Sequence, residues 1–117
     1  MAYIDGYVIA VPTAKKDEYK ELSKSMLTIF KDHGALQMTE CWGDDVPQGK
    51  VTSFPMAVKC QDNETVVFSW IVWPSKEVRT TGMKKAMEDP RMNMDPNSMP
   101  FDGKRMIFGG FEVLVQG

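Results

Sequence analysis

The chain has 117 residues, of which 43% are hydrophobic and 26% are charged, and its formal net charge at pH 7 is −2. We expect it to fold as one domain spanning residues 1–117, because this length and balance are typical of globular proteins and not of disordered or membrane proteins. The slight acidic excess argues against a nucleic-acid partner, because nucleic-acid binding depends on a basic face.

The expected cellular location of the protein rests on the N-terminal segment and on the lengths of the apolar stretches. The uncharged stretch that begins at Thr65 is about half as long as a membrane helix, so we expect no membrane partner. Asp5 interrupts the apolar N-terminal run and no basic leader precedes it, so we expect a cytoplasmic protein. Cys41 and Cys60 are too few for a disulfide framework, and each is expected to be a small buried hydrophobe.

The first predicted elements are a strand, a helix and a second strand. Pro12 lacks the amide hydrogen that a strand needs and ends the first strand, and Thr13 is then placed to cap a helix. The helix ends at Gly34, where a left-handed residue is favoured. Its apolar residues recur at three- and four-residue steps: Tyr19, Leu22, Met26, Ile29, Phe30 and His33. "ALQMTECW", residues 35–42, alternates and predicts the second strand.

A turn-rich insertion separates this unit from a second one. Residues 43–50, "GDDVPQGK", are typical of turns, and residues 51–64 are expected to form a small hairpin or arm. Residues 66–73, "VVFSWIVW", carry no charge and predict a third strand. A helix capped by Ser75 is expected to follow as far as Glu88, although Gly82 inside it costs about 1 kcal/mol of helix propensity.

The chain is then predicted to close with a loop and a fourth strand. Residues 89–103 form a proline-punctuated loop, and residues 105–116, "RMIFGGFEVLVQ", form the strand. Gly109 and Gly110 suggest a β-bulge or a close approach of another group to the backbone. Six of the ten methionines lie between Met83 and Met106, and methionine suits changing apolar surfaces. This region could be a lid over a pocket or a latch onto another subunit.

The two units repeat one pattern: "VIAVPTAKKDEY", residues 8–19, and "WIVWPSKEVRTT", residues 70–81, each run from strand through proline and hydroxyl residue to helix. The order β-α-β, β-α-β predicts an α+β, ferredoxin-like sandwich with a four-stranded antiparallel sheet and two helices on one face. Strands 1, 3 and 4 are apolar on both faces. An uncovered face of this size would exceed the apolar patch that a monomer normally shows. We therefore expect a homodimer that packs sheet to sheet into an α+β barrel.

The sequence also resembles the YbaA-like family of small bacterial proteins of unknown function. The words that carry the resemblance are "YIDGYVIAVP", "HGAL", "ECWGDDVPQGKVTSFPMAV", "FSWIVWPSKEVR", "DPRM" and "MPFDGKRMIFGGFEVLV". They fall in the same order and cover nearly the whole chain. The resemblance implies membership of the dimeric α+β barrel superfamily, which includes cofactor-independent monooxygenases, haem-degrading monooxygenases, lactone isomerases and stress-response proteins.

Two residues are candidates for catalysis. Glu40 shares a strand face with Met38 and Trp42, so it is either buried with a raised pKa, as a functional acid would be, or placed at a solvated strand end. Trp42 could form the wall of a ligand site or belong to the core. His33 is the single histidine and could act as a general base, or pack at the end of its helix. It is also the sole candidate for a haem ligand, and we expect no haem, no other cofactor and no metal site.

Asp5, Ser69 and Arg105 are polar residues on otherwise apolar strands. They could anchor a ligand inside an apolar cavity, or form ion pairs at strand ends. The sequence thus leaves three functions open. The protein could bind or transform a small planar organic molecule without a metal, in the manner of a cofactor-independent monooxygenase or isomerase. It could be a non-enzymatic ligand-binding or stress-response dimer, or a purely structural dimer with a filled core.

Overall fold

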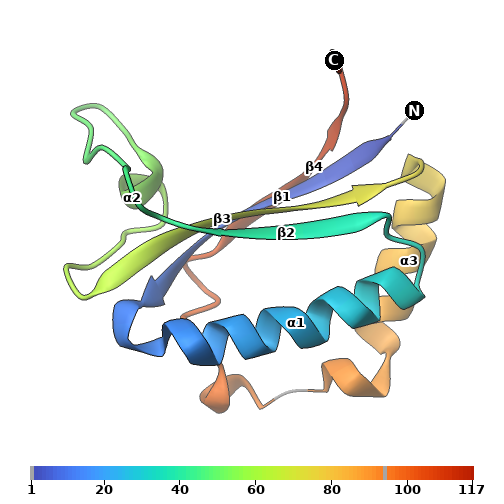
Figure 1. Ribbon diagram of the computed structural model, residues 1–117, viewed down its shortest axis with the longest axis horizontal. Helices are drawn as coiled ribbons and strands as arrows, with labels where there is room; N and C mark the ends of the chain where they lie inside the picture. The colour runs from blue at the N-terminus through green and yellow to red at the C-terminus, as the bar shows by residue number, and fades with distance from the viewer. Residues whose placement is uncertain (1, 94) are drawn as a thin grey trace.

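The computed structural model describes residues 2–93 and 95–117, and it shows one antiparallel sheet with helices packed on it (Figure 1). The strands are β1 (Tyr3–Pro12), β2 (Gln37–Trp42), β3 (Glu64–Trp73) and β4 (Ile107–Glu112). They lie in the order β2-β3-β1-β4. This order and the β-α-β, β-α-β succession confirm the predicted ferredoxin-like fold.

Two long helices cover one face of this sheet. They are α1 (Lys16–Asp32) and α3 (Lys76–Glu88), and Figure 1 shows both on the same side. A short helix, α2 (Phe54–Ala57), belongs to the insertion and lies on the other side. Three 3-10 turns complete the secondary structure: η1 (Thr13–Lys15), η2 (Pro90–Met92) and η3 (Pro96–Ser98). No helix within residues 2–93 and 95–117 is long and apolar enough to cross a bilayer.

The ends of the helices follow the sequence in part. The Ser75 hydroxyl accepts a hydrogen bond from the backbone N–H of Val78 at 3.2 Å, which confirms the predicted cap. Gly34 has φ +109°, as expected for the residue that follows α1. The predicted cap at Thr13 is wrong. That residue begins η1 instead, and its hydroxyl lies 2.7 Å from the hydroxyl of Thr65, because a 3-10 turn comes before α1.

The helix-facing core explains the glycine inside α3. Trp73 is completely buried and meets the ring of Phe30 edge to face, with centroids 6.3 Å apart. A Cβ at Gly82 would lie 2.6 Å from the Trp73 ring and would also meet the carbonyl oxygen of His33. Gly82 therefore lets α3 approach the end of α1 and β3 more closely than any other residue would allow, which offsets its low helix propensity.

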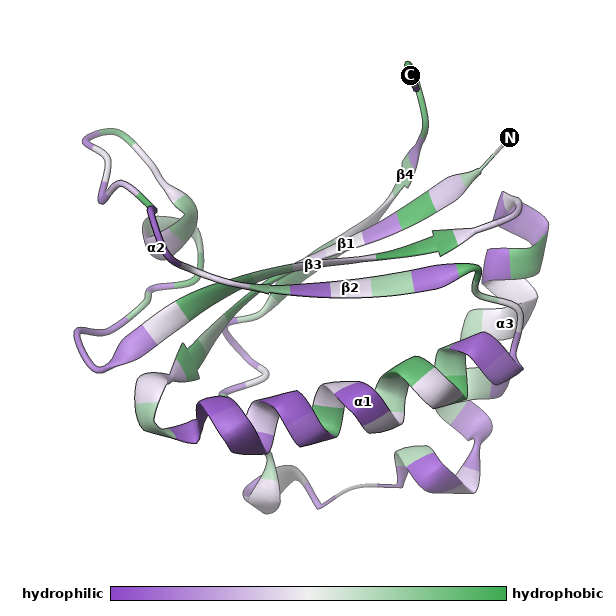
Figure 2. Cartoon of the chain, viewed as in Figure 1, coloured by the Kyte–Doolittle hydropathy of each residue, from purple (hydrophilic) through white to green (hydrophobic). Residues whose placement is uncertain are grey.

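The opposite face of the sheet is covered only at one end. Val58, in the arm after α2, is buried against Val8, Ala10 and Val66. The insertion is therefore an arm, which is one of the two predicted alternatives. It covers a part of the sheet face, whereas the sequence analysis assigned the whole of that face to a second subunit. Large apolar side chains remain exposed over the rest of the sheet's length: Phe68 (44%), Ile107 (44%) and Phe111 (60%). Figure 2 shows the hydrophobic residues that follow one another along β3.

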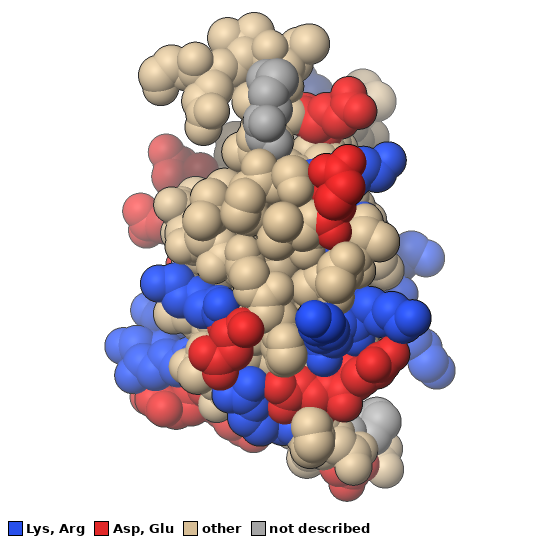
Figure 3. Space-filling model, turned by 90° about the vertical axis from the view of Figure 1, so that its right-hand side faces the viewer, with Lys and Arg blue, Asp and Glu red and all other residues tan. Residues whose placement is uncertain are grey.

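Charge is distributed unevenly between the two layers. In Figure 3 the acidic and basic side chains gather over the helices in the lower part, whereas the upper part, on the side of the C-terminal tail, is mostly uncharged. Leu114 and Val115 in that tail are almost fully exposed.

The prediction for Cys41 is wrong, because this residue is exposed on the edge strand β2 and is not a buried hydrophobe.

The fourth strand pairs with β1 without interruption from Tyr3–Glu112 to Val8–Ile107, so the two glycines do not make a bulge there. A Cβ at Gly110 would lie 2.8 Å from the Tyr3 ring and 2.9 Å from the Arg79 guanidinium. The structure therefore shows the second predicted alternative, a close approach of other side chains to the backbone at Gly110. Of the methionines in the second half, Met83, Met92 and Met106 pack against the core. Met94 lies outside the described residues, and the lid and the latch stay predictions.

Candidate functional site

A cavity of about 370 Å³ lies between α1 and the edge strand β2. Helix residues form one wall, and residues of β2 with one residue of β3 form the other. The lining residues are Lys16, Tyr19, Lys20, Ser23, Lys24, Leu27, Met38, Glu40, Cys41, Trp42 and Val67. The cavity is large enough for a small organic ligand, since such sites begin at about 300 Å³.

Glu40 is the acidic residue of this cavity. It lies in β2 directly opposite Ser69 of β3, and its Oε2 accepts a hydrogen bond of 2.7 Å from the Tyr19 hydroxyl. Burial raises the pKa of the Glu40 carboxyl above its usual value, and hydrogen bonding from Tyr19 and Ser69 offsets only part of that rise. The sequence allowed Glu40 to be either buried with a raised pKa or placed at a solvated strand end. The structure corresponds to the first of these alternatives.

Trp42 stands beside Glu40 on the same face of β2, two residues along the strand, and lines the cavity. The Lys16 ammonium lies over its ring, 5.4 Å from the ring centroid. Leu27, Met38 and Val67 add apolar surface around it. The cavity therefore combines a flat aromatic wall with one carboxylate, which is the composition expected of a site for a small, mostly apolar ligand.

A row of polar side chains leads from this cavity across the sheet. Strand pairing places Glu40 opposite Ser69, and Ser69 opposite Tyr7 of β1. Burial, and next the nearby Asp5 carboxylate, raise the pKa of the Tyr7 phenol. The pKa of the Tyr19 phenol is also raised, first by burial and then by Glu40. The sequence analysis missed both tyrosines, because each lies in an apolar stripe that is typical of the core. Their hydroxyl groups, which distinguish them from purely apolar core residues, could have marked them as candidates.

Asp5 lies outside the cavity and is fully engaged within the protein. Its carboxylate accepts a hydrogen bond of 2.9 Å from the Trp73 indole and further bonds from the Arg79 guanidinium, the shortest at 2.8 Å. Only 3% of the residue is exposed. The structure thus places Asp5 in a buried ion pair between β1 and α3, which corresponds to the structural alternative for this residue.

Arg105 also lies away from the cavity. Its guanidinium donates two hydrogen bonds of 2.7 Å to the Glu64 carboxylate, and a third of 2.8 Å to the backbone carbonyl of Lys59. The Arg105 hydrogen bonds hold the pKa of Glu64 below its usual value. The two residues therefore fasten the arm to the start of β3. Arg105 does not line the α1–β2 cavity, so the structure does not bring this possible ligand anchor together with the catalytic candidate Glu40.

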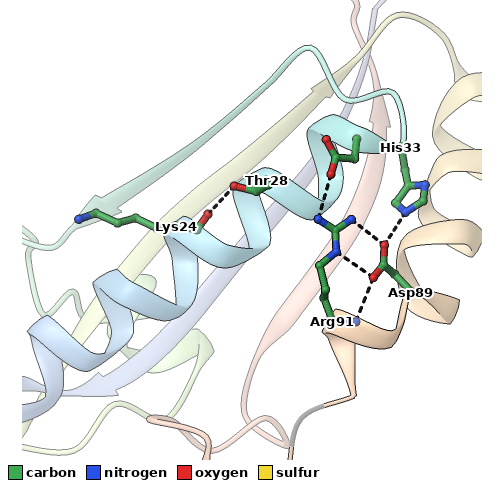
Figure 4. A network of polar contacts seen from close by, with 6 residues as sticks. Lys24, Thr28, His33, Asp89 and Arg91 are labelled. Atoms are coloured by element: carbon green, nitrogen blue, oxygen red, sulfur yellow. Dashed lines mark hydrogen bonds and ion pairs between the residues drawn. The ribbon is translucent and has the colours of Figure 1, made fainter.

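His33 belongs to a separate polar network at the other end of α1 (Figure 4). Its Nε2 lies 2.9 Å from Oδ2 of Asp89, and Arg91 donates to both Asp89 and Asp32. These contacts with Arg91 and His33 hold the pKa of Asp89 well below its usual range. The network joins the end of α1 to η2. His33 lines a second recess of about 400 Å³, between α1 and α3, so it does not share the cavity of Glu40.

Of the six residues predicted for the site, the structure therefore brings three together. Glu40 and Trp42 line the α1–β2 cavity, and Ser69 lies opposite Glu40. Among the described residues, no group of three or more histidine, cysteine, aspartate or glutamate side chains is arranged to hold a metal ion. The chemistry available in the cavity is that of a half-buried carboxylate, a phenol, a tryptophan ring, a thiol and the ammonium groups of three lysines.

The fold places the chain in a class of small ferredoxin-like α+β proteins that includes oxygenase structures. A Bacillus cereus protein, named as a candidate antibiotic biosynthesis monooxygenase, superposes with a TM-score of 0.62 at 12% identity and covers 100% of this chain and 95% of its own. SnoaB of Streptomyces nogalater, described as a cofactor-independent oxygenase, has a TM-score of 0.56 at 13% identity, with 98% and 95% covered. At these identities the likeness shows the fold alone.

The chain belongs to the family described as "Protein of unknown function (DUF1428)", whose profile matches residues 2–103. It is 58% identical over 115 residues to the Uncharacterized protein YbaA of Escherichia coli (strain K12), with 98% of each chain covered. The protein of the same name from Shigella flexneri matches to the same extent. The resemblance to the YbaA-like family is thereby confirmed.

Proposed function

We propose that this protein binds a small planar organic molecule in the α1–β2 cavity and that Glu40 exchanges a proton with it, without a metal. One observation carries the proposal: a half-buried carboxylate with a raised pKa lies in a largely apolar cavity, 2.7 Å from a tyrosine hydroxyl. A carboxyl group is a better general base near neutral pH when its pKa is raised toward that pH. Burial of Glu40 raises the pKa of its carboxyl group in this direction.

The arrangement suits a flat ligand with an acidic proton. Trp42 offers an aromatic wall, and Leu27 on the facing helix limits the width of the cavity. The Tyr19 hydroxyl holds Oε2 of Glu40 in place. A ligand C–H or O–H placed against this carboxylate would transfer its proton to Glu40 and become an anion. Among the neighbours by fold, SnoaB is described as a cofactor-independent oxygenase. An oxygenase without a cofactor must activate its organic substrate with side chains, which is the role proposed for Glu40.

A ligand screen tests the binding step. Thermal unfolding is measured with quinones, phenols and lactones, and a ligand present at a hundred times its dissociation constant should add about 2.7 kcal/mol of stability. Leu27→Trp fills the cavity and should abolish the shift in melting temperature. Val78→Trp, which changes the recess on the other side of α1, is the matched control and should retain it. If no compound class shifts the melting temperature of the unmodified protein, the proposal is wrong.

The role of Glu40 is tested separately with any ligand that the screen finds. Glu40→Gln keeps the shape of the side chain and its acceptor for Tyr19 but removes the base. Exchange of a carbon-bound acidic proton of the ligand for deuterium, followed by NMR, should slow by about two orders of magnitude or more. Glu88→Gln, at an exposed position of α3, should exchange at the unmodified rate. Binding with equal exchange in all three proteins would favour the alternative of a ligand-binding protein that is not an enzyme.

We also propose that two copies associate through the exposed face of the sheet. Phe111 and Ile107 present exposed apolar surface there, and Phe68 stays 44% exposed although the Phe54 ring of α2 packs edge to face against it, with centroids 5.6 Å apart. Figure 3 shows this side of the molecule edge-on at the top, with fewer charged side chains than the helix layer below it. Phe68→Glu should shift the sedimentation coefficient from dimer to monomer. Met87→Glu, on the exposed side of α3, should leave a dimer intact, and a monomeric unmodified protein would contradict the proposal.

A further inference from the structure

We infer that the ligand of the α1–β2 cavity is an organic anion, and that its class is the phenolic aromatic carboxylic acids. This inference rests on the proposed function of the cavity and adds the charge and the orientation of the ligand. The carboxylate of the ligand is expected at the rim of the cavity, beside α1, and its phenol group near Glu40.

The first observation is a row of lysines along one wall. Lys16, Lys20 and Lys24 are spaced by four residues, which places them on successive turns of one helix face. All three line the cavity, and the one acidic residue among the lining residues is Glu40. Three lysines and one ionised glutamate give this surface a charge of about +2, because 3 − 1 = 2. The whole chain carries −2, so the cavity is basic on an acidic protein.

The second observation is that these lysines are little used by the protein itself. Lys24 pairs with Glu21 at 3.3 Å, but both side chains are mostly exposed, and such pairs contribute little. Lys16 lies over the Trp42 ring, which attracts a cation without neutralising it. In the part of the chain that the structure describes, Lys20 forms no ion pair. The ammonium groups are therefore available to an anion that enters the cavity.

The positions of the charges give the ligand its orientation. Glu40 is half-buried against the sheet, whereas 61% of the Lys24 side chain is exposed, at the outer edge of the helix wall. A second negative charge next to the Glu40 carboxylate would be repelled, so the anionic group of the ligand belongs on the lysine side. A neutral hydroxyl can face Glu40. The planar ring between the two groups then packs against Trp42.

Matched pairs of ligands test the inference. The panel consists of hydroxylated benzoic and naphthoic acids, each with its carboxamide, and dissociation constants are measured by calorimetry at low ionic strength. At least one acid should bind about tenfold more tightly than its amide, because two or three nearby ammonium groups attract it. The advantage should fall to about twofold or less in ~1 M salt, where the screening length is about 3 Å.

A triple variant provides the second arm. Lys16→Gln, Lys20→Gln and Lys24→Gln together should remove the preference for the acid and leave amide binding within about twofold of the unmodified protein. Its control replaces the exposed Lys50, Lys76 and Lys84 with glutamine, which changes the net charge equally and touches no lining residue. This control should keep the preference.

The outcomes separate this inference from the proposed function. Amides that bind as tightly as their acids, with no effect of the triple variant, would overturn the anionic class and leave ligand binding in the cavity intact. Equal loss of the preference in both triple variants would assign it to net charge and overturn the role of the lysine row. A panel in which neither acids nor amides bind would overturn this inference, and the proposed function fails with it only if the screen of quinones, phenols and lactones is negative as well.

Discussion

Asp5 and Arg79 form a buried ion pair that joins the first strand to the second long helix, although they are 74 positions apart in the sequence. The Arg79 Nη2 lies 2.8 Å from Oδ1 of Asp5, and the Arg79 Nε contacts both carboxylate oxygens. The Asp5 carboxylate also accepts from the Trp73 indole. This arrangement explains why an aspartate can lie near the start of an otherwise apolar strand, because every charge there has a partner.

Removal of Arg79 should therefore be strongly destabilising. Arg79→Met leaves the Asp5 carboxylate buried without its cation, and we expect a loss of about 3 kcal/mol in the free energy of unfolding. Urea denaturation followed by tryptophan fluorescence measures it. The double variant Asp5→Asn, Arg79→Met should lose less than Arg79→Met alone, because the uncompensated charge is gone. A double variant that is less stable than Arg79→Met by the full cost of Asp5→Asn would contradict this account.

Gly82 allows a test of helix packing. In Gly82→Ala the new Cβ would meet the Trp73 ring at 2.6 Å and the His33 carbonyl, and neither group can move without disturbing the core. We expect a loss of about 2 kcal/mol in spite of the better helix propensity of alanine. Gly103→Ala is the matched control, because a Cβ there meets nothing within 4 Å. Its melting temperature should stay close to that of the unmodified protein, and a stabilised Gly82→Ala would contradict the close approach.

The pair Glu64–Arg105 should make stability depend on pH in acid. Arg105 holds the pKa of Glu64 below its usual value of 4.5, so the contribution of the pair is fully present above that value. It is lost as the pH falls through the lowered pKa of the folded state. Arg105→Met should lower the free energy of unfolding by about 3 kcal/mol near neutral pH, since only 5% of the Glu64 side chain is exposed. The difference between the two proteins should shrink below pH 4.5. A constant difference across the pH range would contradict it.

Glu40 should have the opposite effect. Burial raises its pKa in the folded protein above the usual value of 4.5, so ionisation is less favourable in the folded state than in the unfolded chain. The resulting loss of stability is absent below 4.5 and is complete above the pKa of the folded state. Glu40→Gln should therefore become more stable relative to the unmodified protein as the pH rises. Urea titrations at about pH 4 and about pH 8 measure the change, and a relative destabilisation at the higher pH would contradict the burial.

Much of the fold can be predicted from the sequence, because its signals are local. The uncharged run of β3, the proline at the end of β1 and the glycine after α1 each follow from the chemistry of neighbouring residues. The repeat of two βα units then selects the ferredoxin-like order of strands. The prediction of a helix cap at Thr13 was wrong because a short 3-10 turn and an α-helix begin with the same kind of residue, and a local signal does not distinguish them.

The site could be predicted only in part. The alternation of β2 places Glu40 and Trp42 on one face, and this much is visible in the sequence. Tyr19 lies on a different element, and its hydrogen bond to Glu40 depends on how α1 crosses β2. Arg105 and Asp5 look like ligand anchors in the sequence. Their partners, Glu64 and Arg79, are distant in the chain, so only the folded structure shows that these charges are already neutralised.

Periodicity, turn residues and long matching words are properties of the linear chain, and they were enough to predict the four strands, the two long helices, their order and the family. The tertiary structure decided which polar residues share a cavity and which are paired within the protein. Hydrogen bonds and ion pairs form between atoms a few ångströms apart in space, and the distance along the chain does not fix that separation. The lysine row of α1 came to lie opposite Glu40 through packing alone.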